Sequence, residues 1–94
     1  MKLVGRKRLS DFAKKPADAR PWLETWIAQV RHARWEKPQD IKNRYRSASF
    51  LPDNRVIFNV KGNLYRMEVQ IAYRAGIVAV KRIGTHAEYQ RWHR

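Results

Sequence analysis

The 94-residue sequence contains no cysteine, and its three histidines, His32, His86 and His93, are far apart. Without thiols the chain can form neither a disulfide nor a thiolate metal site, and the histidines do not have the spacing of zinc ligands. The sequence also lacks a cluster of carboxylates. We therefore expect a protein that needs no metal and no other cofactor.

Long apolar segments are absent too. No apolar run approaches the roughly 20 residues that cross a bilayer, and residues 1–8 lack the apolar stretch of a secretory signal. These absences predict a soluble, cytoplasmic protein. At this length we expect a single domain over residues 1–94, whose small core depends strongly on its four tryptophans.

Negative charge is scarce: 8 Asp and Glu stand against 21 Lys and Arg, which gives a net charge of +13. Small soluble domains usually carry a net charge of about 2 to 8. A positive field of this size attracts polyanions, and the basic residues are spread along the chain rather than gathered in a tail. The composition therefore favours a folded, basic surface for nucleic acid. An acidic protein partner and an anionic membrane are the alternatives.

The N-terminal half has a helical pattern. Residues 1–4 can form a short strand, and Leu9, Phe12 and Ala13 lie on one face of a helix predicted over residues 7–15. A second helix is expected to start with Asp18 as its N-cap and Pro21 in its first turn. A short third helix over residues 38–45 and an irregular stretch through residue 53 should follow. The apolar stripe of the second helix is Trp22, Leu23, Trp26, Ile27, Val30 and Ala33. Its helical spacing predicts that these aromatic side chains are core rather than a surface for stacking bases.

From Arg55 onward apolar and polar residues alternate, which predicts strands. A two-residue turn at Gly62-Asn63 pairs Val60 with Tyr65, Phe58 with Met67 and Val56 with Val69, and a one-residue slip would destroy this match. A second turn, centred on Ala75-Gly76, pairs Tyr73 with Val78 and Ile71 with Val80. A four-residue loop keeps the same side chains on the apolar face, whereas a three-residue loop would turn Lys81 into the core. We therefore predict an α+β fold in which the helices cover the apolar face of a three-stranded antiparallel sheet.

The same register arranges the polar face of the sheet. Asn59, Arg66 and Thr85 should lie side by side across three strands, and Lys81 should lie opposite Gln70. Arg82 falls on the apolar face opposite Val69, unless its guanidinium extends to solvent at the sheet margin or the strand bends there.

The residues Thr85-His86-Ala87-Glu88 fit a capping box that starts a last, short helix. His86 then takes the first helical position and Tyr89 lies on the same side, so Arg66, His86 and Tyr89 should converge beside a helix N-terminus. Free N–H groups and the helix dipole favour a phosphate there.

These residue types can cleave RNA without metal. The 2′-hydroxyl attacks the adjacent phosphorus, and the protein supplies a base, an acid and positive charge. His86 can be base or acid, Tyr89 its partner or a stacking group, and Arg66 with Lys61 or Lys81 the charge clamp. Asn59, Arg74 and Arg82 are further candidates for RNA contacts.

Each candidate also has a purely structural interpretation. Arg66 can be a solvated strand residue paired with Glu68 or Glu88, and His86 a surface residue at a helix start. Tyr89 can pack on the sheet. Lys61 and Lys81 can simply be solvated charges.

Two motifs resemble the HigB family of RelE-like toxins from bacterial toxin–antitoxin pairs. They are Phe58-Asn59-Val60-Lys61-Gly62-Asn63-Leu64-Tyr65-Arg66 and Ile83-Gly84-Thr85-His86-Ala87-Glu88-Tyr89, and Trp35, Pro38, Asp40-Ile41-Lys42 and Ser49-Phe50 fit the family's middle segment. Gln90 stands where related sequences often have aspartate.

The resemblance implies a RelE-like fold and an mRNA interferase, a hydrolase that inhibits translation by cutting mRNA on the ribosome. It also implies neutralisation by a helix-turn-helix, HigA-like antitoxin, with which the toxin forms an oligomer. In this resemblance, Arg66 corresponds to the family's arginine that follows the hairpin tyrosine, and Tyr89 corresponds to the aromatic residue of its final helix. His86 fits the family's Thr-His motif. A non-catalytic RNA- or ribosome-binding module and a protein whose basic surface serves only an acidic antitoxin are the rival functions.

Overall fold

The computed structural model describes residues 1–92 of the chain, so His93 lies outside the described residues. The elements follow one another as β1 (Lys2–Val4), α1 (Arg6–Phe12), a 3₁₀ turn (Ala17–Ala19), α2 (Arg20–His32), α3 (Pro38–Arg44), β2 (Ser49–Leu51), β3 (Arg55–Val60), β4 (Tyr65–Ala72), β5 (Ile77–Thr85) and α4 (His86–Trp92). This order confirms the predicted α+β class.

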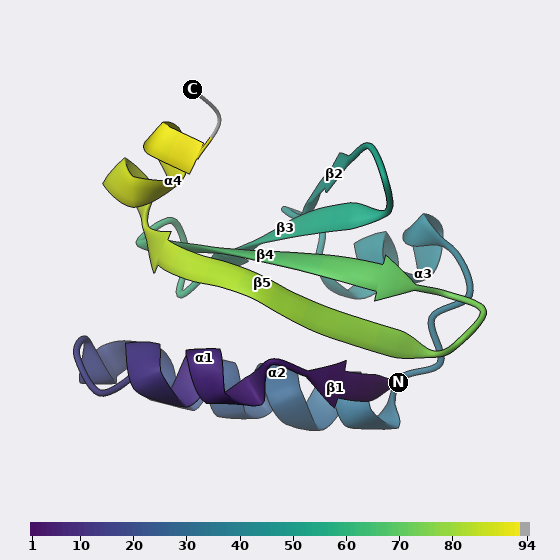
Figure 1. The fold of residues 1–94 in the computed structure, drawn as a ribbon, viewed down its shortest axis with the longest axis horizontal. Helices are drawn as coiled ribbons and strands as arrows, with labels where there is room; N and C mark the ends of the chain where they lie inside the picture. The colour runs from purple at the N-terminus through teal and green to yellow at the C-terminus, as the bar shows by residue number, and fades with distance from the viewer. Residues whose placement is uncertain (93–94) are drawn as a thin grey trace.

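The strands form one sheet in the order β1-β5-β4-β3-β2. The first strand pairs parallel with β5, and the other neighbours are antiparallel. Helices α1 and α2 lie together along one face of the sheet, whereas α4 projects from the opposite side at the end where β5 finishes (Figure 1). The sheet therefore has one face covered by α1 and α2 and a second, largely open face.

The core lies between the sheet and the helices. Alternate side chains of β3 and β4 enter it, and α2 contributes Leu23, Trp26 and Val30, as its three- and four-residue spacing predicts. Trp26 is only 1% exposed, but Trp22 is partly buried at the margin of the core. The stripe is thus core at its centre and accessible at its N-terminal end.

The N-terminal elements differ from the prediction in two ways. Helix α1 ends at Phe12 rather than residue 15, because the chain tightens into an i→i−3 turn in which the Lys15 N–H donates to Phe12 O at 3.2 Å. Asp18 is not the N-cap of α2: that position is Ala19, which makes no side-chain capping bond. Asp18 instead accepts hydrogen bonds from the Tyr65 hydroxyl in β4 and from Lys61 Nζ in the β3–β4 turn.

The sheet is larger than the predicted three strands. The expected first strand is present as β1, and residues 49–51, predicted to be irregular, form the short edge strand β2 against β3. The three residues of β2 are too few to show the apolar–polar alternation that predicts a strand, and Phe50 among them is 38% exposed.

The β3–β4 hairpin has the predicted register, including Val60 opposite Tyr65 and Phe58 opposite Met67. The β4–β5 hairpin does not. Ile71 pairs with Val78 and Val69 with Val80, because residues 73–76 form a four-residue loop. The shift of two residues keeps the predicted side chains on the apolar face.

A β-bulge then changes the second half of β5. Val69 pairs with Val80 but Glu68 pairs with Arg82, which leaves Lys81 as the extra residue. The predicted pairing of Lys81 with Gln70 is therefore wrong, and Gln70 lies opposite Ala79. The bend resolves the position of Arg82, which turns to the open face opposite Glu68.

Candidate active site

The last helix begins as the sequence predicts. Glu88 N–H donates to Thr85 Oγ1 at 3.2 Å, and Thr85 N–H donates to Glu88 Oε1 at 2.8 Å, which is the reciprocal pattern of a capping box. The N–H of His86 also donates to Leu64 O at 3.3 Å, in the β3–β4 turn. The start of α4 is thus tied to the turn that precedes Arg66.

Arg66, His86 and Tyr89 converge at this junction. The Cζ atom of Arg66 lies 5.6 Å from the ring centre of Tyr89, within the range of a cation–π contact. The ring centres of His86 and Tyr89 are 6.3 Å apart, with an angle of 32° between their planes. A guanidinium, an imidazole and a phenol therefore share one surface beside the N-terminus of α4.

The guanidinium of Arg66 is held by backbone oxygen atoms. Its Nη1 donates to Asn63 O at 3.1 Å and to Tyr65 O at 3.3 Å. Within residues 1–92 these hydrogen bonds use Nη1 alone, so Nε and Nη2 retain N–H groups that can bind an anion. The predicted ion pair of Arg66 with Glu68 or Glu88 is not among the salt bridges of the described residues.

Gln90 faces His86 across one helical turn. Its Nε2 lies 3.3 Å from His86 Nε2, where the side-chain amide can donate to an unprotonated ring nitrogen. The contact restrains the orientation of the imidazole.

A second set of contacts fixes α4 on the sheet. Arg82 donates from Nε and Nη2 to Glu68 Oε1, at 3.3 and 3.1 Å, and its Cζ lies 4.7 Å from the ring centre of Trp92. Glu68 is 4% exposed and also lies 3.9 Å from Arg55 Nη1. The glycine at position 84 allows the close packing, since an added Cβ would lie 3.1 Å from both Glu88 Cβ and Trp92. Arg82 thus connects the buried acid of the sheet to the helix that carries His86 and Tyr89.

The predicted row of Asn59, Arg66 and Thr85 is only partly correct. Asn59 lies opposite Arg66, but the bulge places Gly84 opposite Arg66 on its other side, and Thr85 opposite Tyr65. Asn59 donates from its side-chain amide to Ser47 O at 3.3 Å.

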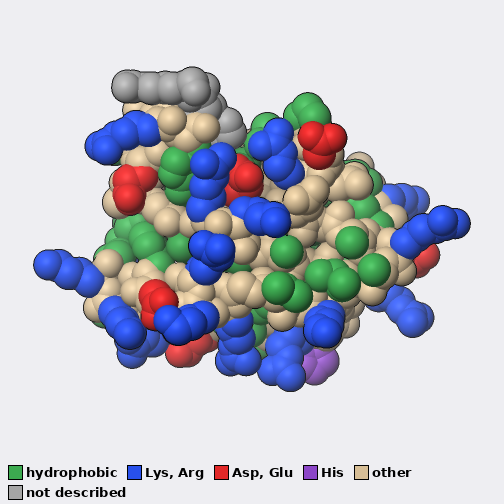
Figure 2. Space-filling view, in the orientation of Figure 1, with side chains coloured by type: hydrophobic (Ala, Val, Ile, Leu, Met, Phe, Trp, Pro, Cys, Tyr) green, Lys and Arg blue, Asp and Glu red, His purple; other side chains and the backbone are tan. Residues whose placement is uncertain are grey.

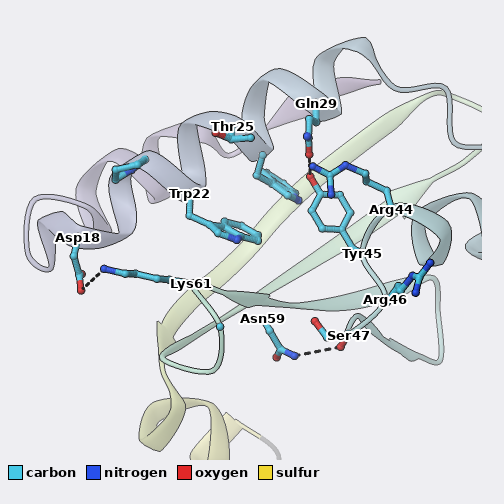
Figure 3. Close-up of a pocket in the computed structure, with 13 residues that line it drawn as sticks. Asp18, Trp22, Thr25, Gln29, Arg44, Tyr45, Arg46, Ser47, Asn59 and Lys61 are labelled. Atoms are coloured by element: carbon cyan, nitrogen blue, oxygen red, sulfur yellow. Dashed lines mark hydrogen bonds and ion pairs between the residues drawn. The ribbon is translucent and has the colours of Figure 1, made fainter.

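The remaining predicted RNA-binding residues lie elsewhere. Lys61 points toward Asp18, with Nζ 3.3 Å from Oδ2, and away from α4 (Figure 3). Lys81 is exposed at the bulge, and Arg74 is exposed in the β4–β5 loop, at the far end of the sheet from α4. Of the predicted charge clamp, only Arg66 is beside the rings of His86 and Tyr89.

Sequence reasoning missed a cleft of about 900 Å³ between α2, the segment that follows α3, and the end of β3 (Figure 3). It is lined by Asp18, Pro21, Trp22, Thr25, Trp26, Gln29, Arg44, Tyr45, Arg46, Ser47, Asn59, Lys61 and Gly62. The basic-aromatic-basic run Arg44-Tyr45-Arg46 was the signal that could have drawn attention to it.

Asp18 lies at one end of this cleft. The Tyr65 hydroxyl donates to Asp18 Oδ1 at 2.7 Å, and this bond, with help from Lys61, lowers the pKa of the carboxyl below its ordinary value. The same bond raises the pKa of the Tyr65 phenol. Asp18 is therefore charged at neutral pH and has Tyr65 and Lys61 as its partners.

Lysine and arginine side chains surround the visible face of the molecule, with few acidic groups between them (Figure 2). Among residues 1–92, no helix has the length and apolar character needed to cross a membrane. This face thus carries the broad positive charge expected from composition.

A comparison with family models finds that residues 19–92 match the HigB toxin model, described as the RelE-like toxic component of a toxin-antitoxin system. A comparison with curated proteins finds no match. The matched segment runs from the start of α2 to the end of α4, and the helix-covered, mostly antiparallel sheet is consistent with a RelE-like fold.

Proposed function

Because this chain belongs to the HigB family of RelE-like toxins, the toxic components of toxin–antitoxin systems, we propose that it is a metal-independent endoribonuclease that cleaves mRNA on the ribosome. A toxin of this kind has a cognate antitoxin, and we propose that its partner is a HigA-like helix-turn-helix protein that binds it in the cytoplasm. The convergence of Arg66, His86 and Tyr89 beside the capping box carries the proposal.

The proposed reaction needs only these side chains and the RNA itself. The 2′-hydroxyl loses its proton to a base and attacks the neighbouring phosphorus. The bond to the 5′-oxygen then breaks, the 5′-oxygen takes a proton from an acid, and a 2′,3′-cyclic phosphate and a 5′-hydroxyl remain. Arg66 neutralises the extra negative charge of the phosphorane through N–H groups that its backbone contacts leave available.

His86 and Tyr89 serve the proton transfers and the orientation of the RNA. The imidazole is exposed and close to the phenol ring, so both can face the same phosphodiester. Arg66 packs against the phenol of Tyr89 and so fixes the position of the ring next to the phosphate that it binds.

The assay is cleavage of mRNA by the purified protein on translating ribosomes, with RNA binding measured in parallel. Arg66→Ala and His86→Ala should each lower the cleavage rate at least about 100-fold, because each removes a group that acts on the transition state. Binding should persist, since each variant changes at most one of many positive charges.

Arg31→Ala is the matched control for loss of charge. Arg31 is exposed in the last turn of α2, at the end of the molecule away from α4 (Figure 1), so this variant should cleave normally. Normal cleavage by both site variants would disprove the assignment of these residues. RNA binding without any cleavage by the wild-type protein would favour the non-catalytic module instead.

A further inference from the structure

One of the side chains that line the cleft beside α2 carries a buried hydrogen-bond donor. Trp26 is 1% exposed, and in the part of the chain that the structure describes its indole N–H has no hydrogen-bond partner. Buried polar groups in folded proteins are nearly always paired, so an unpaired donor on a side chain that lines a cleft points to an acceptor supplied by a ligand.

The neighbouring polar groups do not supply that acceptor. Gln29 follows Trp26 on α2, and its Oε1 accepts a hydrogen bond from the Tyr45 hydroxyl across the cleft (Figure 3). Burial raises the pKa of this phenol, so Tyr45 remains a neutral donor at neutral pH. The two groups satisfy each other, which leaves the indole N–H of Trp26 for a third group.

The walls of the cleft suit a flat aromatic ligand. Trp22 is partly exposed and lies 6.2 Å from Tyr45 between ring centres, while Trp26 and Tyr45 both pack on Phe58 beneath the cleft. Aromatic side chains bind nucleic-acid bases by stacking, with little dependence on sequence.

The rim of the cleft is positively charged. Arg44, Arg46 and Lys61 line it, against the single carboxylate of Asp18. That carboxylate already has Lys61 and the Tyr65 hydroxyl as partners. An anionic group on the ligand would therefore meet the guanidinium groups of Arg44 and Arg46 at the side of the cleft away from Asp18 (Figure 3).

Position connects the cleft to the candidate active site. Asn59 lines the cleft and is the ladder partner of Arg66, so the two sites occupy adjacent strands. Paired residues of neighbouring strands are only about 5 Å apart. One RNA strand can therefore reach both sites.

We propose that this cleft binds one nucleotide of the RNA substrate that flanks the scissile phosphate. The base lies against Trp22 and accepts a hydrogen bond from the indole N–H of Trp26, and its phosphate contacts Arg44 and Arg46. The assignment to a substrate nucleotide rests on the proposed ribonuclease function, but binding of a nucleotide to the cleft does not.

Nuclear magnetic resonance of ¹⁵N-labelled protein tests binding directly, because each tryptophan gives one indole N–H signal. We expect AMP, GMP, CMP or UMP to move the Trp26 signal, while inorganic phosphate at the same concentration leaves it in place. Arg66→Ala and His86→Ala should show the same shift, since neither residue lines the cleft.

Two variants test the contacts. Trp26→Phe keeps an aromatic ring but removes the donor, and it should weaken nucleotide binding about 3- to 10-fold. Trp22→Leu removes a partly exposed ring and should weaken binding at least about 5-fold, which provides a second test if Trp26→Phe folds poorly. Phe50→Leu, which changes an exposed aromatic residue outside the cleft lining, should bind normally.

The outcomes separate the two proposals. Cleavage by the wild-type protein with no shift of the Trp26 signal would overturn the nucleotide site alone. A shift with any nucleotide but no cleavage would overturn the ribonuclease alone. A Trp26 signal that moves only when the antitoxin is added would identify the cleft as a protein-binding groove and would also overturn the nucleotide site.

Discussion

The two faces of the sheet differ in the side chains that they carry. The face that α1 and α2 cover is apolar, whereas the opposite, open face carries charged side chains. On the covered face Val56, Phe58, Met67 and Val69 are at most 1% exposed and belong to the hydrophobic core. On the open face the same strands carry Arg55, Arg66 and Glu68, and β5 adds Arg82 after its bulge. The covered face supplies the core, whereas the open face presents the candidate site.

The open face is not uniform, because the row of Ile57, Glu68 and Arg82 across it is buried at its first two positions. Ile57 lies opposite Glu68, and Glu68 opposite Arg82, with exposed fractions of 2% for Ile57 and 4% for Glu68. The carboxylate is satisfied by Arg82 and approached by Arg55. This row is where the stability of the sheet and the placement of α4 depend on the same side chains.

Removal of a ring from the covered face should have the largest effect on stability. Phe58 is 1% exposed, and its ring centre lies 5.1 Å from Tyr45 and 5.5 Å from Trp26. Phe58→Ala should lower the free energy of unfolding by about 3–5 kcal/mol, through lost burial and the cavity left behind. Urea denaturation measures the change.

Phe50→Ala is the control for that experiment, since Phe50 is 38% exposed on the edge strand β2. It should cost less than about 1 kcal/mol. Equal losses for the two variants would mean that burial against the helices does not set the stability of this face.

Substitution of Glu68, the buried acid of the open face, should have an intermediate effect on stability. Glu68→Gln removes the charge that pairs with Arg82 but keeps the size of the side chain, and it should lower the free energy of unfolding by about 1–3 kcal/mol. Arg82 and Arg55 are partly exposed, so water limits the cost of leaving them without an anion.

Glu24→Gln, at an exposed position on α2, is the matched substitution and should change stability by no more than about 0.5 kcal/mol. If Glu68→Gln were equally neutral, Glu68 would not be coupled to the stability of the sheet.

The same two faces explain what the sequence could predict. Alternation of apolar and polar residues placed Val56, Phe58, Met67 and Val69 correctly, because a half-buried sheet penalises any slip that turns apolar groups to water. The capping box at Thr85 was predictable because all its interactions are local in sequence.

The β4–β5 register, the bulge and the cleft depend on geometry that leaves little local signal in the sequence. The loop of residues 73–76 moved the β4–β5 pairing by two residues, which leaves the apolar pattern intact and so cannot be detected from it. The bulge at Lys81 was suggested only by the awkward position of Arg82. The cleft joins α2, the segment after α3 and β3, so only the fold brings Gln29, Tyr45 and Asn59 together.

Loss of the capping box should give the smallest change in stability, at the end of the sheet that carries the candidate site. Thr85→Ala removes the oxygen that accepts from the Glu88 N–H and should lower the free energy of unfolding by about 1 kcal/mol. Thr85→Ser keeps that oxygen and should match the wild-type protein.

Hydrogen exchange of the α4 amides separates local from global opening: in Thr85→Ala these amides should exchange faster while those of β4 change little. Since α4 carries His86 and Tyr89, cleavage should fall along with this local protection. Unchanged exchange in α4 would mean that the helix is held by Arg82 and Trp92 rather than by its cap.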